Sequence, residues 1–325
     1  MIITEWIERL YAQPFFSTVT FGIIAMVIHG SSWCLVGLVM GESPKKGVSP
    51  ALVQLGGSIF STAAGLVILS FTGKFSHAPW GVTAAVLADY FVIGVMTFIL
   101  MELMSYAMQR GPNGVIWSVI QSAMIFPFVC GVLFFGVKMN FLRGLGVVLL
   151  LGALACFGLS KDNSARPSCP GSWRIPAFAG LLLAGIQQSL ATLPSYYPAA
   201  REVSSITRTL SAGSGIMAAA IVYTLRHMTP EMRDQIRNSF RNKTLLKYIM
   251  ILQGFGLFFA YALFYPGLDT MAANGLGGMC YPILVGSCIL SFTAASLLML
   301  KEKMRPIQLG ALVCCVSGLV LICMK

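Results

Sequence analysis

The sequence predicts an all-α integral membrane protein with ten transmembrane helices, arranged as two inverted five-helix repeats. Of the 325 residues, 57% are hydrophobic and only 10% are charged, whereas a typical soluble domain carries about 25% charged residues. The chain also contains ten apolar runs, each long enough to cross a hydrocarbon layer of about 30 Å. Finally, parts of its two halves align with each other without gaps. These three observations define the expected fold.

A helical bundle is favoured over a β-barrel because lipid-embedded backbone must satisfy its own hydrogen bonds, and no alternating strand pattern is present. The predicted helices cover residues 15–39, 49–72, 82–108, 113–136, 141–160, 176–199, 203–225, 246–268, 273–299 and 306–324. The break between the sixth and seventh helices rests on Pro194 and Pro198 and on the charged pair Arg201 and Glu202.

The opening residues "MIITEWIERL" carry Glu5, Glu8 and Arg9 and precede a long apolar run. This combination does not resemble a cleaved signal peptide. We expect a short interfacial helix that ends near Pro14.

Positive charge is concentrated in the connections between the predicted helices. The odd-numbered connections hold 15 of the 22 Lys and Arg residues, and the termini and even-numbered connections hold 6. The positive-inside rule then places both termini away from the cytoplasm. The loop from Arg226 to Lys247 is expected to lie on the membrane surface as a basic amphipathic helix, with Met232, Ile236 and Phe240 on one face. The net charge of +11 therefore points to topology and lipid contact, and not to nucleic acid.

Internal repetition is the most informative sequence feature. A shift of 164 residues aligns Arg110–Lys138 with Asn274–Glu302, and a shift of 158 residues relates the start of each half. The coinciding glycines are Gly111 with Gly275, Gly114 with Gly278, Gly146 with Gly310, Gly22 with Gly180, and Gly57 with Gly215. The two repeats are expected to cover residues 1–165 and 166–325. An odd number of helices in each repeat makes the second copy enter the membrane from the opposite side.

The segment Ala262–Ile322 resembles the second repeat of the drug/metabolite transporter superfamily, EamA-like type. The likeness rests on a small-residue helix, a short turn containing Lys301 and Glu302, and a closing helix of the form Q-x-x-G that begins at Gln308. The first half departs from this pattern, because Lys138 stands where the family usually carries glutamate. The stretch Leu252–Tyr265 is weakly similar to the proton-coupled rhamnose transporter branch. The resemblance implies a ten-helix carrier with alternating access and, contrary to the charge count, cytoplasmic termini.

A carrier site is expected near the bilayer midplane, where the two repeats meet. The shift of 158 residues pairs His29 with Gln187. The shift of 164 residues pairs Asp89 with Gln253, and Trp117 with Tyr281. Asn113, Trp117 and Gln121 share one helix face, as do Asn274, Gly278 and Tyr281. The candidate substrate-binding residues are His29, Trp33, Trp117, Gln121, Gln187, Gln253, Asn274 and Tyr281, and the candidate coupling-ion residues are Asp89 and His29.

Each candidate also has a structural explanation. Buried glutamines commonly hydrogen-bond across membrane helices, and Trp117 and Tyr281 also suit an interfacial aromatic belt. The alternative for His29 is a neutral histidine that is hydrogen-bonded to a carbonyl. Asp89 is either an ion-path residue or a headgroup contact. Glu102 is expected to face an aqueous vestibule.

We therefore expect a secondary transporter of a small organic metabolite such as an amino acid, sugar or amine in a bacterial plasma membrane. Its partners are the solute, membrane lipids and, if transport is proton coupled, protons; the chain is a monomer or a homodimer. No catalytic motif, metal-ligand spacing, disulfide framework or cofactor signature is present, so enzyme activity, metal and cofactor are not expected. The alternatives are a multidrug or toxic-metabolite exporter of the same fold, a passive channel or receptor, and an intramembrane enzyme.

Overall fold

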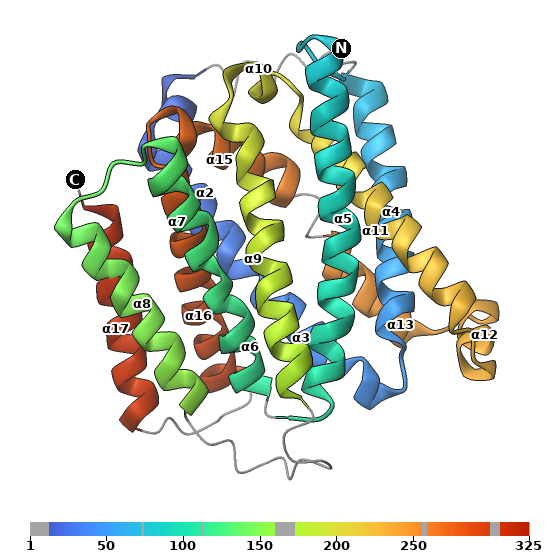
Figure 1. Ribbon diagram of the computed structural model, residues 1–325. Helices are drawn as coiled ribbons and strands as arrows, with labels where there is room; N and C mark the ends of the chain where they lie inside the picture. Colours follow the sequence, from blue (N-terminus) through green and yellow to red (C-terminus); the bar gives the residue numbers. More distant parts are fainter. Residues whose placement is uncertain are drawn as a thin grey trace.

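The computed structural model describes residues 13–72, 75–111, 113–159, 173–254, 259–299 and 306–324, which form a single helical bundle (Figure 1). Within these ranges the β-structure is limited to one isolated bridge between Ser76 and Val203. The helices are α2 (Val19–Ser32), α3 (Cys34–Glu42), α4 (Pro50–Thr72), α5 (Trp80–Met108), α6 (Asn113–Gln121), α7 (Ile125–Phe135), α8 (Phe141–Leu159), α9 (Arg174–Tyr196), α10 (Pro198–Arg201), α11 (Ser205–Arg226), α12 (Pro230–Arg237), α13 (Lys243–Ile249), α15 (Tyr265–Ala273), α16 (Cys280–Met299) and α17 (Pro306–Cys323).

The predicted class, an all-helical membrane protein, is confirmed. In the described part of the chain, five segments are long and apolar enough to cross a membrane, namely Val19–Glu42, Pro50–Phe71, Trp80–Met108, Val115–Phe135 and Arg174–Tyr196. Shorter apolar helices follow at Phe141–Cys156, Gly277–Ser291 and Leu309–Cys323. The chain is thus a multi-pass membrane protein. The predicted N-terminal interfacial helix and the turn at Lys301 and Glu302 lie outside the described residues, as does the Gln308 side chain.

Several long helical segments are interrupted near the middle of the bundle. Trp33 separates α2 from α3 with a tight turn, in which its N–H donates to the Gly30 carbonyl at 3.0 Å. The 3₁₀ turn Ser122–Met124 separates α6 from α7. Between α13 and α15 lie two π-helical segments, Met250–Gly254 and Ala260–Phe264. Such interruptions change the hydrogen-bond register and often mark functional positions.

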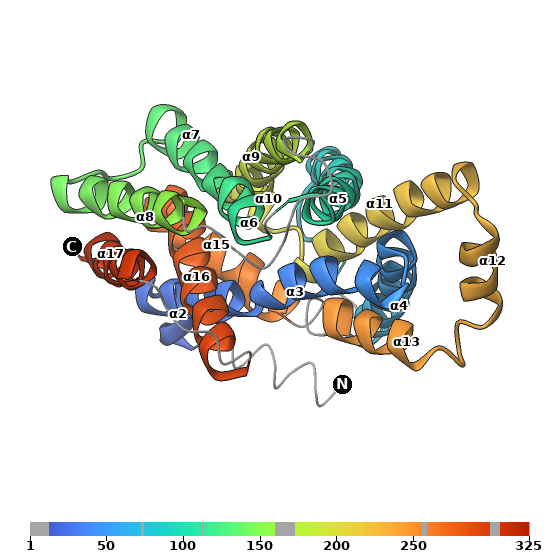
Figure 2. The same ribbon diagram turned by 90° about the horizontal axis from the view of Figure 1, so that it is seen from below.

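The helices form two rows that are joined at both ends (Figure 2). One row holds α2, α3 and α16, with α2 packed on α16, and the other holds α9, α6 and α7, with α9 packed on both. At one end of the rows α8 packs on α17, and at the other α11 packs on α4 and α5. Interior side chains therefore come from both halves of the sequence.

We call the end of the bundle that carries α10 the upper end (Figure 1). There the segment Phe75–Pro79 lies on the turn between α10 and α11. The His77 N–H donates to the Glu202 carbonyl at 3.1 Å, and the Ser204 hydroxyl donates to the Phe75 carbonyl at 3.0 Å. Ser204 also caps α11 by accepting from the Thr207 N–H. These bonds fix the start of α11.

The basic loop at the opposite, lower end folds only partly as expected. Thr229 caps α12 and Pro230 occupies its first turn, as is favourable at a helix start. Met232 is buried, and Gln235 donates to the Gly47 carbonyl at 2.9 Å. Phe240 lies beyond the end of α12 and is 92% exposed. The expected shared face of Met232, Ile236 and Phe240 is therefore wrong, because α12 ends at Arg237 and turns Met232 towards the bundle.

Glycines permit the closest helix crossing in the described bundle. A Cβ on Gly94 of α5 would overlap the carbonyl oxygen of Ala212 of α11, and a Cβ on Gly215 of α11 would overlap that of Phe91. Small residues allow such approach between membrane helices, where packing replaces the hydrophobic effect. Gly146 and Gly310, which the sequence shift aligns, have different surroundings. Gly146 packs on Gly318, whereas an added Cβ on Gly310 would have no neighbour within 4 Å.

Replacing Gly94 or Gly215 with alanine is expected to destabilise the protein by about 1–3 kcal/mol, because the added methyl group meets immobile backbone. The matched control is Gly152→Ala in α8, where an added Cβ meets nothing within 4 Å. Thermal melting in detergent measures the effect. Equal melting temperatures for Gly94→Ala and Gly152→Ala would contradict the close crossing.

Candidate functional site

An aromatic and polar cluster occupies the interior where the interrupted helices meet. The His29 ring of α2 lies with its centroid 4.8 Å from the Phe264 ring and 5.9 Å from the Trp33 ring. Tyr281 of α16 lies 6.2 Å from Trp33 and 6.1 Å from Phe264, again between ring centroids. Three of the predicted site residues, His29, Trp33 and Tyr281, are thus brought together.

The hydrogen bond of His29 determines its tautomer. Trp33 Nε1 lies 3.1 Å from His29 Nε2, and because an indole N–H can only donate, Nε2 must be the acceptor. A neutral imidazole then carries its proton on Nδ1. Nδ1 is buried and has no hydrogen-bond partner among the described residues. His29 therefore carries an unpaired, buried N–H donor, and among the described residues the simple bond to a carbonyl that the sequence left open is not formed.

Gln121 and Trp117 extend this cluster towards the lower end. Both side chains lie beside Cys288 of α16, and both residues are buried. The Trp117 ring also covers Gly37 of α3, whose added Cβ would approach the ring at 3.0 Å. The burial of Trp117 and Tyr281 speaks against an interfacial aromatic belt, in which these side chains would face headgroups.

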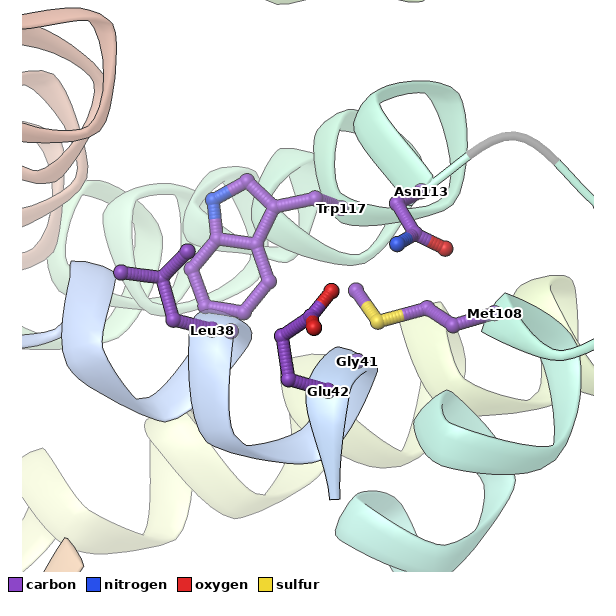
Figure 3. A pocket seen from close by; sticks show the side chains of 7 residues that line it. Leu38, Gly41, Glu42, Met108, Asn113 and Trp117 are labelled. Atoms are coloured by element: carbon purple, nitrogen blue, oxygen red, sulfur yellow. The ribbon is translucent and has the colours of Figure 1, made fainter. Parts of the chain in front are cut away.

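A small pocket lies below Trp117 (Figure 3). Its volume is about 50 Å³, and it is lined by Gly37, Leu38, Gly41, Glu42, Met108, Asn113 and Trp117. Figure 3 shows the Glu42 carboxylate, the Asn113 amide and the Met108 thioether pointing towards one another beside the Trp117 ring. Glu42 also accepts from Lys45 Nζ at 2.8 Å and is partly exposed. This pocket holds a small polar group and no more.

Gln187 bonds across helices, which is one of the two roles that the sequence left open for it. Its Nε2 donates to Thr97 Oγ1 of α5 at 3.1 Å, so Gln187 joins α9 to α5. The neighbouring Gln188 lies on the buried face of α9 with Ala184 and Ala191, and its Oε1 has no partner among the described residues. The two neighbours face different surroundings because consecutive helix positions differ by about 100° in direction.

Asn274 and Gln253 also have mainly structural contacts. Asn274 is exposed at the end of α15, and its Nδ2 donates to the Thr270 carbonyl at 2.8 Å. The predicted shared face of Asn274 with Tyr281 is wrong, because α15 ends at Ala273 and a turn with Gly275 at φ 72° redirects the chain before α16. The Gln253 side chain packs against Gly57 of α4. Glu102 is paired as well, since its Oε1 accepts from Gln54 Nε2 at 2.8 Å.

A buried ion pair near the upper end is the main feature that the sequence analysis missed. Arg208 of α11 donates from Nη1 to Asp269 Oδ1 of α15 at 3.0 Å and from Nη2 to the Ala200 carbonyl at 2.9 Å. The Ser195 hydroxyl donates to the same Asp269 oxygen at 2.6 Å. The available signal was an arginine inside the seventh apolar run and an aspartate one residue past the predicted end of the eighth.

Two aromatic rings adjoin this pair. The Arg208 guanidinium carbon lies 5.9 Å from the centroid of the Tyr265 ring, which meets the Tyr90 ring edge-on at 5.1 Å. Tyr90 donates to the Ala191 carbonyl at 3.2 Å. Asp89, the predicted coupling-ion residue, precedes Tyr90 and has a buried Oδ2 without a partner in the described chain. Asp89 thus lies near Tyr90 and Tyr265, whereas His29 belongs to the central aromatic cluster.

Comparisons with known proteins give a likeness of fold. No protein-family model matches the chain, and no curated protein matches it. A solved structure described as "Crystal structure of protein" aligns over 94% of this chain and 96% of its own, with a TM-score of 0.64 and 13% sequence identity. Near-complete coverage of both chains means that they share the overall fold. In the described residues no group of three His, Cys, Asp or Glu side chains is arranged to hold a metal ion.

Removing one member of the Arg208–Asp269 pair is expected to cost about 3–5 kcal/mol, because the remaining charge stays buried. Arg208→Gln and Asp269→Asn should each lower the melting temperature more than the double variant, in which neither charge remains. Thermal melting of all four proteins tests this coupling. Additive losses in the double variant would mean that the two side chains do not interact.

The two adjacent glutamines are expected to behave differently. Gln187→Ala removes the bond to Thr97 and should lower stability by about 1 kcal/mol. Gln188→Ala should leave stability nearly unchanged, because its Oε1 loses no bond. Parallel melting curves of the two variants measure the difference. A larger loss for Gln188→Ala would show that this side chain, and not Gln187, holds the helices together.

Proposed function

We propose that this protein is a secondary active transporter that moves a small organic metabolite across a membrane by alternating access. The observation that carries the proposal is the convergence of helix interruptions on His29, Trp33, Gln121 and Phe264 in the bundle interior. Irregular backbone at membrane depth is tolerated only where protein or a water-filled cavity surrounds it. Carriers place their substrate sites at such discontinuous helices.

Helix packing supports the proposed ten-helix inverted repeat. Under the shift of 158 residues, Gly57 of α4 and Gly215 of α11 are equivalent. Gly57 meets Gln253 of the eighth predicted span, and Gly215 meets α5, the third. Packing of α2 on α16 likewise corresponds to packing of α9 on α6 and α7. A pseudo-two-fold relation accounts for both correspondences, with α8 and α17 paired across the axis.

We further propose that the chain is an EamA-like member of the drug/metabolite transporter superfamily in a bacterial plasma membrane. The sequence likeness over Ala262–Ile322 supports this, as does the all-helical bundle with several membrane-spanning helices. Amino acids, sugars and amines are the proposed solute classes. Aromatic rings with a few oriented polar groups, here His29 Nδ1 and Gln188 Oε1, suit such solutes. Proton coupling through Asp89 or His29 is part of the same proposal.

A multidrug exporter is the second candidate. The residues that line the pocket in Figure 3 favour it, but the size of the pocket does not. A carboxylate beside an indole ring suits an organic cation. The pocket volume of about 50 Å³ is well below the roughly 300–1,000 Å³ of sites for drug-sized ligands. Because the pocket is too small for a drug-sized ligand, the metabolite transporter is the first candidate.

A thermal-shift screen of the purified protein against amino acids, sugars and amines tests the proposed function, followed by counterflow of each stabilising solute in proteoliposomes. His29→Ala is expected to weaken ligand binding about tenfold or more, because an oriented donor in a buried site is lost. Asp89→Asn should lower uptake driven by a proton gradient. Val148→Ala on the exposed face of α8 is the control and should behave as wild type.

Two results would overturn the proposal. The first is that no metabolite stabilises the wild-type protein or exchanges across the vesicle membrane. The second is solute flux without counterflow, which is the behaviour of a channel. If His29→Ala and Asp89→Asn both keep the full ligand response and transport, the site assignment fails while the transport function stands.

A further inference from the structure

Arg208 is more deeply enclosed than its ion-pair partner. The Arg208 side chain is 0% exposed and the Asp269 side chain is 20% exposed. A charged group this deep in a membrane protein is costly and usually serves a function. The central aromatic cluster proposed above to bind solute makes no contact with this guanidinium in the described structure. Its role therefore needs a separate explanation.

The hydrogen bonds of Arg208 do not satisfy all the donors of its guanidinium group. Its contact with Asp269 uses one carboxylate oxygen, Oδ1, which also accepts from the Ser195 hydroxyl. Arg208 Nε is buried and has no hydrogen-bond partner among the described residues. Arginine binds a carboxylate best through two parallel N–H bonds. Asp269 does not form this paired arrangement, so another carboxylate can bind Arg208 better than Asp269 does.

We propose that Arg208 binds the carboxylate group of the transported solute, which displaces Asp269 from the guanidinium. The inference rests on the proposed transport function and specifies its substrate class as monocarboxylates. Because Arg208 is fully enclosed and Asp269 is partly exposed, an incoming anion reaches the pair from the Asp269 side. It therefore exchanges with Asp269 and does not bind beside it.

The surrounding charges select for a single negative charge. Asp89 Oδ2 is buried without a partner next to Tyr90, and the rings of Tyr90 and Tyr265 adjoin Arg208. Once Asp269 is displaced, the Arg208 cation faces the bound anion, and the Asp269 carboxylate remains nearby. A doubly charged phosphate would add further repulsion at low local dielectric. A monocarboxylate fits this charge pattern.

Displacement of Asp269 would free α15 to move. This helix is preceded by the π-helical segment Ala260–Phe264 and followed by Gly275 at φ 72°, so irregular backbone bounds it on both sides. Phe264, which contacts His29, directly precedes α15. Binding at Arg208 is thereby linked to the central aromatic cluster through one short helix.

Matched pairs of solutes test the proposal on the full-length purified protein. The pairs are phenylalanine with phenylalaninamide and gluconate with glucose, and glucose 6-phosphate supplies the phosphate arm. Thermal shift and direct titration are carried out on wild type, Arg208→Lys, Asp269→Asn and the control Val148→Ala. The member of each pair that carries a carboxylate should bind wild type, and its counterpart without a carboxylate should not.

The key variant is Asp269→Asn, because it removes the internal competitor and keeps Arg208. Carboxylate affinity should rise about 5- to 100-fold, the usual range of coupling between two competing states. The carboxylate should also raise the melting temperature of Asp269→Asn more than that of wild type. Arg208→Lys should lose most carboxylate affinity, since an ammonium group cannot form the paired bonds. A purely structural ion pair would not produce the gain in Asp269→Asn.

Unchanged or lower carboxylate affinity in Asp269→Asn would overturn the proposal, even if Arg208→Lys fails to fold. Equal binding of phenylalanine and phenylalaninamide, or of gluconate and glucose, would also overturn it. So would a response to glucose 6-phosphate alone. If neutral solutes are exchanged in proteoliposomes and carboxylates are not, transport stands and only the carboxylate site fails. If no solute of any class is exchanged, the proposed function itself fails.

Discussion

The main constraint on this structure is that backbone amides within lipid must be hydrogen-bonded by the protein itself. Regular helices meet this requirement wherever they face lipid, as α8 does along Val148 and Gly152. Two of the interruptions lie where neighbouring helices pack on them. Trp33 and the turn Ser122–Met124 are of this kind.

Close helix packing follows from the same constraint. Water does not drive helices together inside a bilayer, so van der Waals contact and buried polar bonds must do so. The crossing at Gly94 and Gly215 brings two backbones together, and the bond from Gln187 to Thr97 joins α9 to α5. The ion pair of Arg208 with Asp269 adds a third kind of contact. This contact depends on two opposite charges, whereas the glycine crossing is fixed by shape.

Hydropathy predicted the helices well, and the reason is physical. A run of about 20 apolar residues has few alternatives to a helix in a membrane, so the predicted ranges lie within a few residues of the observed ones. The exceptions occur where local hydrogen bonding decides. The eighth predicted run, residues 246–268, spans the two π-helical segments and ends inside α15. Asp269 was thereby assigned to a loop, although it is part of a helix and bonded to Arg208.

The sequence by itself determined the helical membrane class, the approximate helix ranges and the candidate residues His29, Trp33 and Tyr281, which the fold brings together. These features depend on local composition and spacing. Only the tertiary structure decided that Gln188 and not Gln187 faces the interior, that Asn274 caps a helix, and that Arg208 meets Asp269. Such outcomes depend on helix rotation, where one residue changes direction by about 100°, and on contacts between segments 61 residues apart. Helical periodicity within one segment determines neither the rotation of that helix in the bundle nor its contacts with distant segments.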